Sequence, residues 1–291
     1  MSETKYFPTV EAIDKASQVL DEILEPTPFQ RNANLSDIYD AEVYLKREDL
    51  QMVRSYKIRG AYNKIRTIDP ESVKNGIVCA SAGNHAQGVA FAARELKIMG
   101  SIFMPVTTPR QKIEQVKMFG KEFIEIILTG DTFDAANSAA IEYAQDNNKT
   151  FIPPFDDPKV MEGQGTIGRE IFNQSKEPLD YIFVPIGGGG LASGLGAYIS
   201  RMSPSTKIIG VEPGGAPCMK AAIENDIYVI IDFHEHHAEH WVDLSKEFFT
   251  YFAKKWGSYP NVMYEIYNEP MNGTSNETVV SYAKEIIPVI R

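Results

Sequence analysis

Residues 181–194 read YIFVPIGGGGLASG, an apolar, buried-looking β-rich run that leads through four consecutive glycines into an apolar helix. A tight strand-to-helix turn alone needs one or two glycines, so four in a row, Gly187–Gly190, suggest a second purpose. Backbone without side chains can turn its N–H groups inward at a helix start, where the helix dipole attracts an anion. The pattern therefore predicts a phosphate-binding turn, with a close-packed turn as the alternative. No Lys-Ser/Thr pair follows, which excludes the P-loop of nucleoside triphosphatases.

The alternation of strand and helix continues along the whole chain. The β-rich runs are residues 43–46, 76–80, 101–105, 123–128, 180–186, 207–211, 228–233 and 261–267. The amphipathic stretches are residues 9–24, 57–67, 84–96, 109–119, 131–147, 160–175, 190–201, 215–225, 241–256 and 277–290, with Thr9, Asp131 and Asp243 as cap-like residues. Strands separated by helices predict an α/β fold with parallel sheets covered on both faces. Ligands of such sheets bind where strands end, so the loops after strands are the expected site.

Residues 81–88, SAGNHAQG, follow one of these strands and begin a helix. Small and polar residues at a helix start leave backbone N–H groups free for an anion, and a carboxylate is the natural guest. The Asn84 amide would be free to bond a neighbouring oxygen. The alternative is an ordinary capped helix, because Ser and Asn are common caps. His85 taken alone favours a structural role.

Residues 46–61, KREDLQMVRSYKIRGA, form a third loop of interest. The charges at 46–49 are consistent with a solvated loop. Lys57 differs, because it begins an apolar helix, where the dipole disfavours a cation. Burial there would lower the pKa of its amine and make it a nucleophile toward a carbonyl. An amine for an aldehyde, a nest for a phosphate and an anion site for a carboxylate are together what pyridoxal phosphate and an amino acid require.

Seven motifs, in order along the chain, resemble the biosynthetic threonine dehydratases, which are fold-type II pyridoxal-phosphate enzymes. They are KREDLQMVRSYKIRGAYNKI, CASAGNHAQGVA, FMPVTTPRQKI, LTGDTFDAA, PPFDDPKVMEGQGT, VPIGGGGLASG and IIGVEP. The resemblance is continuous over residues 1–222. It implies a three-layer fold with parallel sheets, in which a smaller subdomain at about residues 50–150 is inserted into a larger one. It also implies deamination of L-threonine and L-serine to the 2-oxo acid and ammonia.

The same resemblance implies roles for single residues. Lys57 would hold pyridoxal 5′-phosphate as a Schiff base and then act as the base at the substrate Cα. The other cofactor-binding residues would be Asn84, at the ring hydroxyl, Gly187, Gly188, Gly189 and Gly190, at the 5′-phosphate, and Leu191. The substrate carboxylate would be surrounded by Ser81, Gly83, His85 and Gln87. A cation site of some relatives would fall at residues 212–218, where Cys218 replaces a hard oxygen ligand, so no metal is expected.

Residues 223–291 depart from that pattern and resemble two consecutive βα units of the (β/α)8 barrel of family-5 glycoside hydrolases, the cellulase type. The matching positions are His234, Asn268 and Glu269, and in that family the Glu is the general acid/base. Two βα units cannot close an eight-stranded barrel, and the second carboxylate that glycoside hydrolysis needs lies on a later strand in that family. The chain is therefore interpreted as a chimera joined near residues 221–226.

The chimera interpretation leaves the activity open. The family's later Gly-rich turn, which partners the pyridine nitrogen, is missing, so lyase activity would be impaired. The two β-rich runs of the tail have the pattern needed to extend the parallel sheet in place of the missing strands. The alternatives to a lyase are a glycoside hydrolase fragment and an inactive scaffold. His236 and His240 would share a helical face, but the HExxH pattern of zinc proteases is absent.

Composition restricts the partners. The chain has 291 residues and a net charge of -10, which argues against a nucleic-acid or anionic-membrane surface. No apolar run approaches the ~18 residues of a membrane span, and the first residues have no signal-peptide pattern, so a cytoplasmic location is expected. Two cysteines cannot form a disulfide framework. The expected partner is a small-molecule amino acid substrate, and a homo-oligomer stays open.

Overall fold

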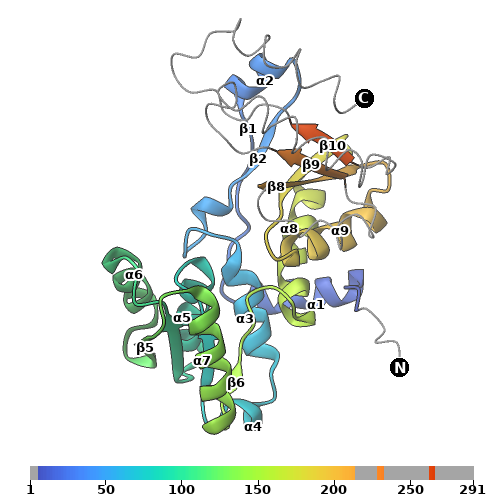
Figure 1. Ribbon diagram of the computed structural model, residues 1–291. Helices are drawn as coiled ribbons and strands as arrows, with labels where there is room; N and C mark the ends of the chain where they lie inside the picture. The colour runs from blue at the N-terminus through green and yellow to red at the C-terminus, as the bar shows by residue number, and fades with distance from the viewer. Residues whose placement is uncertain (1–5, 214–227, 233–261, 266–291) are drawn as a thin grey trace, which may run out of the picture. The chain divides into compact units, whose positions relative to one another are not determined.

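The computed structural model describes residues 6–213, 228–232 and 262–265, and the chain divides into two compact units (Figure 1). The first unit comprises Met1–Pro178 and Ser193–Ser203, and the second comprises Leu179–Ala192 and Pro204–Arg291. The division expected from the sequence, at residue 222 with a subdomain at about 50–150, stays a prediction. Within the described residues, no helix is long and apolar enough to cross a membrane.

The described elements follow the expected alternation closely. The helices are α1 (Val10–Leu20), α2 (Ala33–Tyr39), α3 (Lys57–Thr67), α4 (Pro70–Val73), α5 (Asn84–Leu96), α6 (Arg110–Gly120), α7 (Phe133–Asp146), α8 (Pro158–Gln174) and α9 (Gly190–Met202), with 3₁₀ turns η1 (Glu48–Leu50) and η2 (Lys121–Phe123). The strands are β1 (Phe29–Arg31), β2 (Tyr44–Lys46), β3 (Ile77–Ala80), β4 (Gly100–Met104), β5 (Ile124–Leu128), β6 (Thr150–Phe151), β7 (Tyr181–Pro185), β8 (Lys207–Pro213), β9 (Tyr228–Asp232) and β10 (Val262–Glu265).

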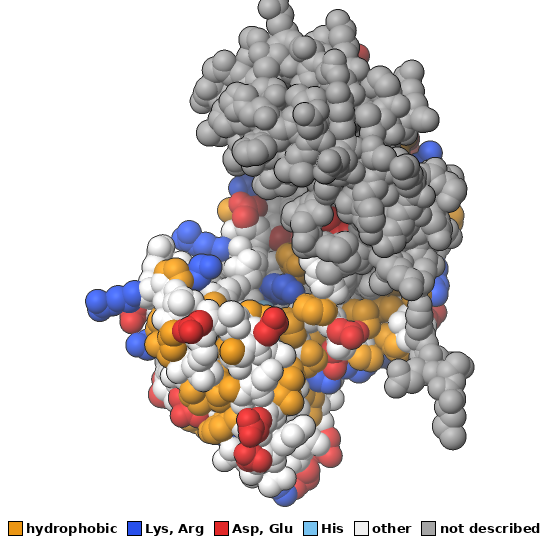
Figure 2. Space-filling view, viewed as in Figure 1, with side chains coloured by type: hydrophobic (Ala, Val, Ile, Leu, Met, Phe, Trp, Pro, Cys, Tyr) orange, Lys and Arg blue, Asp and Glu red, His pale blue; other side chains and the backbone are white. Residues whose placement is uncertain are grey.

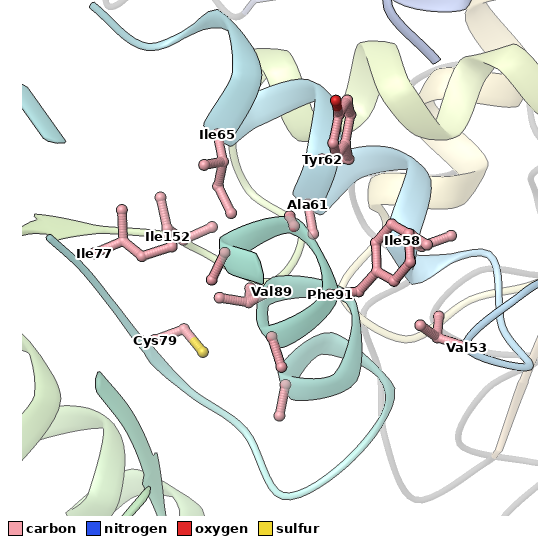
Figure 3. Close-up of a cluster of buried hydrophobic side chains, with 14 of the residues drawn as sticks. Val53, Ile58, Ala61, Tyr62, Ile65, Ile77, Cys79, Val89, Phe91 and Ile152 are labelled. Carbon is pink, nitrogen blue, oxygen red and sulfur yellow. The ribbon is translucent and has the colours of Figure 1, made fainter. Parts of the chain in front are cut away.

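The first unit is built around a parallel sheet of order β5-β4-β3-β6. Side chains of β3 alternate between its two faces. Ile77 and Cys79 join the larger core with α3 and α5 (Figure 3), whereas Val78 and Ala80 pack with Ala140 of α7. Both faces of β3 are therefore covered, as the alternation of strand and helix predicts.

The second unit contains a parallel sheet of order β10-β9-β8-β7. In its register, Ile182 lies opposite Ile208, Ile209 opposite Tyr228, and Val229 opposite Val262. The two tail strands thus extend the sheet that carries the glycine turn, in the way their sequence pattern allows. The structure corrects one expectation here, because β7 is only half-buried: Tyr181 is 51% and Phe183 61% exposed.

Three further features differ from the sequence-based prediction. The strands β1 and β2 pair antiparallel, with Gln30 opposite Leu45, as a separate two-stranded ribbon. Helix α7 is capped by Thr132, whose side chain accepts from Ala135 N, and not by Asp131. The short elements α2, α4, β1 and β6 were not anticipated, since segments of two to seven residues carry too little periodicity to recognise.

Glycines bring the helices of the first unit unusually close together. A Cβ on Gly163 of α8 would lie 2.7 Å from Gly60 Cα of α3. A Cβ on Gly88 of α5 would lie 3.2 Å from the backbone of Ile58. Such contacts leave no room for a side chain, so α3 is held between α5 and α8 near its first turn.

The surface of the described part mixes apolar and charged side chains (Figure 2). Met118, Leu128 and Phe133 are among the exposed apolar residues and lie on different elements. Folded proteins expose much apolar surface, so exposure of such residues does not by itself indicate a function.

Candidate active site

Lys57 is the first residue of α3, as the sequence predicts. Its Nζ donates a hydrogen bond to the carbonyl oxygen of Pro154, at 2.7 Å. The ring centroids of Tyr56 and Phe155 lie 5.6 and 6.0 Å from the same nitrogen. The amine therefore lies among aromatic rings and a backbone carbonyl, and among the described residues no carboxylate forms an ion pair with it.

This environment changes the acidity of the lysine. Burial lowers the pKa of Lys57 from 10.5 to about 8, because the charged form loses its hydration. At pH 7 the neutral fraction of such an amine is about one in ten, against about one in three thousand for an ordinary lysine. Lys57 therefore has the expected position at the start of a helix and the expected direction of pKa shift, and its role as a nucleophile stays a prediction.

The loop between β3 and α5 is where the sequence predicts an anion site. Ser81 Oγ accepts a hydrogen bond from Gly83 N at 3.1 Å, which closes a small turn before the helix. Asn84 begins α5 and is exposed. No side chain caps this helix start, and a Cβ on Gly83 would meet no described atom within 4 Å. The first N–H groups of α5 are thus open to a ligand.

His85 points into the protein interior. Its Nε2 lies 3.0 Å from the carbonyl oxygen of Ile152, and the side chain is buried. Burial, together with the nearby Lys57 charge, lowers the pKa of His85 to about 4. The ring is therefore neutral at physiological pH, and Nε2 carries the proton that it donates to the carbonyl. This geometry agrees with the structural role that the sequence suggested, and leaves contact with a substrate carboxylate a prediction.

Gln87 is also buried, and its Nε2 donates to Gln115 Oε1 of α6 at 3.3 Å. Neither Gln115 nor the loop of Pro154 and Phe155 was anticipated. Gln115 lies 28 residues from Gln87, and Pro154 lies 97 residues from Lys57, so no local pattern connects them.

The glycine turn of the second unit is formed by backbone alone. Ile186 N donates to Val211 O at 2.7 Å, which ends the pairing of β7, and α9 begins at Gly190. Gly189 has a φ of +82°, in the region that favours glycine. A Cβ on Gly187 or on Gly189 would meet no described atom within 4 Å. No described atom therefore lies close to the Cβ side of Gly187 or Gly189, although Gly190 is buried, and this argues against close packing as the reason for glycine at those two positions.

The charged loop before Lys57 is not simply solvated, which corrects a second expectation. Arg47 and Asp49 pair with each other near the surface, at 2.7 Å. Lys46 and Glu48, in contrast, are largely buried in ion pairs with Glu170 and Arg59. The alternating charges therefore belong to two environments, and sequence alone does not distinguish them.

Several residues singled out in the sequence lie outside the described residues. They are His234, Asn268 and Glu269 of the glycosidase-like segment, His236, His240 and Cys218. Nothing in the structure bears on them.

The fold and these residues describe a class of protein: a parallel α/β protein with a buried lysine at a helix start and two strand-to-helix turns that contain glycine. A family model described as "Pyridoxal-phosphate dependent enzyme" matches residues 20–261. The chain belongs to this family, and its cofactor is pyridoxal phosphate. The match continues past residues 221–226, where the change in sequence pattern predicts a junction.

Individual relatives agree with the family. The chain is 56% identical over 215 residues to the biosynthetic L-threonine dehydratase of Halalkalibacterium halodurans, covering 74% of this chain and 52% of the relative. It is 56% identical over 207 residues to that of Bacillus subtilis, covering 71% and 49%. The chain therefore spans about half the length of the curated relatives it matches.

Solved structures give the same fold. The processed threonine deaminase isoform 2 of Solanum lycopersicum matches with a TM-score of 0.68 and 40% identity, over 76% of this chain and 65% of that one. Maize serine racemase matches with a TM-score of 0.70 and 30% identity, over 76% and 66%. The fold-type II architecture with parallel sheets, expected from the motifs, is thereby confirmed.

Proposed function

We propose that the chain is a pyridoxal-phosphate-dependent lyase that deaminates L-threonine, and secondarily L-serine, to the 2-oxo acid and ammonia. The observation that carries this proposal is Lys57, an amine at an uncapped helix start with a pKa lowered to about 8 and no carboxylate partner among the described residues. The dehydratases to which the chain is similar support the choice of substrate.

The residues present suit the cofactor. Lys57 supplies the amine that an aldehyde needs, and the turn at Gly187–Gly190 has open backbone where a phosphate would lie. We assign the 5′-phosphate to this turn and to Leu191, and the ring hydroxyl to Asn84. Ser81, Gly83 and Gln87 are assigned to the substrate carboxylate, with His85 holding the loop through Ile152.

In this mechanism pyridoxal phosphate, when bound, supplies the electron sink that stabilises the negative charge developing at the substrate Cα. Lys57 Nζ removes the Cα proton, which requires the neutral amine that burial favours. The carbonyl of Pro154 accepts from the same nitrogen and so orients the proton acceptor. Loss of the β-hydroxyl then releases water, and hydrolysis of the unsaturated product gives the 2-oxo acid and ammonia.

The glycoside hydrolase alternative for residues 223–291 receives no support from the comparisons. The family model instead continues through residue 261. The chimera therefore stays a prediction from the sequence, as does impaired turnover caused by a missing pyridine partner.

Product analysis tests the proposed function. The purified chain, loaded with pyridoxal phosphate, should form 2-oxobutanoate from L-threonine and pyruvate from L-serine, measured by coupled reduction of the 2-oxo acid. Chiral chromatography of the remaining serine is the comparison. Racemised serine without any 2-oxo acid would refute the lyase assignment in favour of a racemase.

A further inference from the structure

Arg59 is buried two residues after Lys57 and uses every N–H group of its guanidinium. Nε and Nη2 donate to the two oxygens of Glu48, each at 2.8 Å. Nη1 and Nη2 donate to the two oxygens of Glu170, at 2.5 and 3.0 Å. The remaining Nη1 bond goes to Thr166 Oγ1 at 3.1 Å. A guanidinium has five such donors, so none is left for another partner.

Lys46 and Thr27 complete the cluster. Lys46 Nζ donates to Glu170, to Thr27 O at 2.7 Å and to Gln174 Oε1 at 2.9 Å. Thr27 Oγ1 donates to Glu48 at 2.5 Å. Two cations thus face two carboxylates, and the Arg59 side chain is only 2% exposed. We call Lys46, Glu48, Arg59 and Glu170 the Arg59 network.

Stability alone does not explain this network. Removing charges from water is costly, and well-packed apolar residues of similar volume often stabilise a protein as well or better. A guanidinium that donates two parallel hydrogen bonds to a carboxylate also fixes the geometry of the pair. Its N–H groups lie in one plane, so each carboxylate binds in one orientation. The network joins the β2–η1 segment, α3 and α8 by directed bonds, so it fixes how α3 begins relative to both.

The start of α3 packs closely against Gly88 and Gly163, but it lacks the side-chain contacts that usually stabilise a helix N-terminus. Tyr56 at the N-cap makes no side-chain capping bond, and the first turn carries no acidic residue. A rotation of about 100° per residue places Arg59 about 200° around the helix from Lys57. Lys57 therefore projects from one face, toward Pro154, while Arg59 is clamped on the opposite face.

We propose that Arg59, held by Glu48 and Glu170, is a positioning residue that fixes the first turn of α3 and thereby the place of the Lys57 amine. This inference rests on the proposed role of Lys57 as the lysine that carries the cofactor. A misplacement of about 1 Å in a reacting group can reduce the rate about a hundredfold. Directed hydrogen bonds that fix the position of the amine therefore contribute something that apolar packing does not.

The test compares Arg59→Lys with Arg169→Lys in the full chain. Lysine keeps the charge at position 59, but its three donors on a single nitrogen cannot form two bidentate pairs with the carboxylates. Arg169 is the matched control, because it also lies on a helix of the first unit and pairs with Asp14 and Ser17, at 2.9 and 3.0 Å. Both variants lose a directed arginine contact, and only one of them touches the start of α3.

The first readout does not depend on the cofactor. The chain freed of cofactor is labelled with acetic anhydride from pH 6 to 11, and acetylation of Lys57 is followed by mass spectrometry. In Arg59→Lys the amine should become more hydrated, so its labelling midpoint should move up from about 8 toward the ordinary value of 10.5. The second readout is the rate at which added pyridoxal phosphate gives the visible band, which should fall about ten- to a hundredfold.

Arg169→Lys should lower the melting temperature and leave both readouts unchanged. An unchanged labelling midpoint in Arg59→Lys refutes the proposal, whatever its stability. If Arg59→Lys does not fold, Thr166→Val decides, because it removes one acceptor of Arg59. It should shift both readouts in the same direction, with capture about threefold slower, and no shift there refutes the proposal.

The two proposals can fail separately. Retention of the visible band in Lys57→Ala would overturn the role of Lys57 as cofactor carrier. The labelling midpoint would still report whether the Arg59 network controls the environment of that amine.

Discussion

Two strand-to-helix junctions, one in each unit, contain most of the residues predicted to bind a ligand, and they are built differently. The junction from β3 to α5, residues 81–84, follows a strand buried on both faces and leads to side chains that are hydrogen-bonded inside the first unit. The junction from β7 to α9, residues 186–190, follows a half-exposed strand and offers backbone only. We therefore expect a ligand at the first junction to be bound through side chains and helix N–H groups, and a ligand at the second junction to be bound through backbone alone.

The largest effect on cofactor binding and activity is expected when the Lys57 amine of the first unit is removed. Lys57→Ala should abolish the visible band of the bound cofactor and reduce 2-oxobutanoate formation below detection, because no other described lysine begins a helix in such a buried position. Absorbance and borohydride trapping followed by peptide mapping check this. Lys64→Ala is the control, since Lys64 lies on the same helix and pairs with Asp157 at 2.7 Å. Trapping at a lysine other than Lys57 would contradict the assignment.

The next largest effect is expected when the same negative charge is added to each junction in turn, which tests whether the two junctions bind different ligands. Gly188→Asp should weaken pyridoxal-phosphate binding by about a hundredfold or more, because it fills the turn and repels a phosphate. Gly83→Asp should leave cofactor binding nearly unchanged and raise the KM for threonine by about tenfold, because it repels the substrate carboxylate. Fluorescence titration of the cofactor and initial-rate kinetics measure the two effects. Equal losses of cofactor affinity in both variants would show that the junctions do not divide the ligands in this way.

A smaller effect concerns the pH at which the amine reacts. The amine reacts in its neutral form, so cofactor capture should rise about tenfold per pH unit below pH 8 and become level above it, since burial lowers the pKa of Lys57 to about 8. Stopped-flow absorbance from pH 6 to 10 measures the rate, with Nα-acetyl-lysine as the control amine. A rate that keeps rising to pH 10 would mean that Lys57 is not desolvated before the cofactor binds.

The smallest effect tests the backbone of the second junction. Gly189→Ala should cost about 1–2 kcal/mol in the free energy of unfolding, because Gly189 has a φ of +82°. Gly187→Ala should be nearly neutral, since a Cβ there meets no described atom within 4 Å and its backbone lies outside the positive-φ region. Thermal unfolding of both variants provides the comparison. Equal melting temperatures would argue that the turn relaxes without strain.

Much of the candidate site could be read from local sequence. The helices that begin at Lys57, Asn84 and Gly190 were expected at those residues. Apolar periodicity and the change from strand to helix depend only on residues that are close together in the sequence. The glycine turn was equally accessible, since a run of residues without side chains constrains the backbone wherever it occurs.

Other features could not be read from the sequence because they depend on residues far apart in the chain. The charges at Lys46 and Glu48 resembled a solvated loop until the structure placed them against Arg59 and Glu170. The exposure of Phe183 also follows from what covers β7, and the apolar letters of that strand do not reveal it.

The sequence by itself determined the order of strands and helices, the family, and the residues able to react, since these depend on local periodicity and residue chemistry. Only the tertiary structure decided the burial, the pKa and the hydrogen-bond partners of those residues. Lys57 meets the carbonyl of Pro154 across 97 residues, and Arg59 meets Glu170 across 111. Burial, which lowers the pKa of Lys57, and the directed bonds that hold Arg59 both arise when distant segments exclude water together.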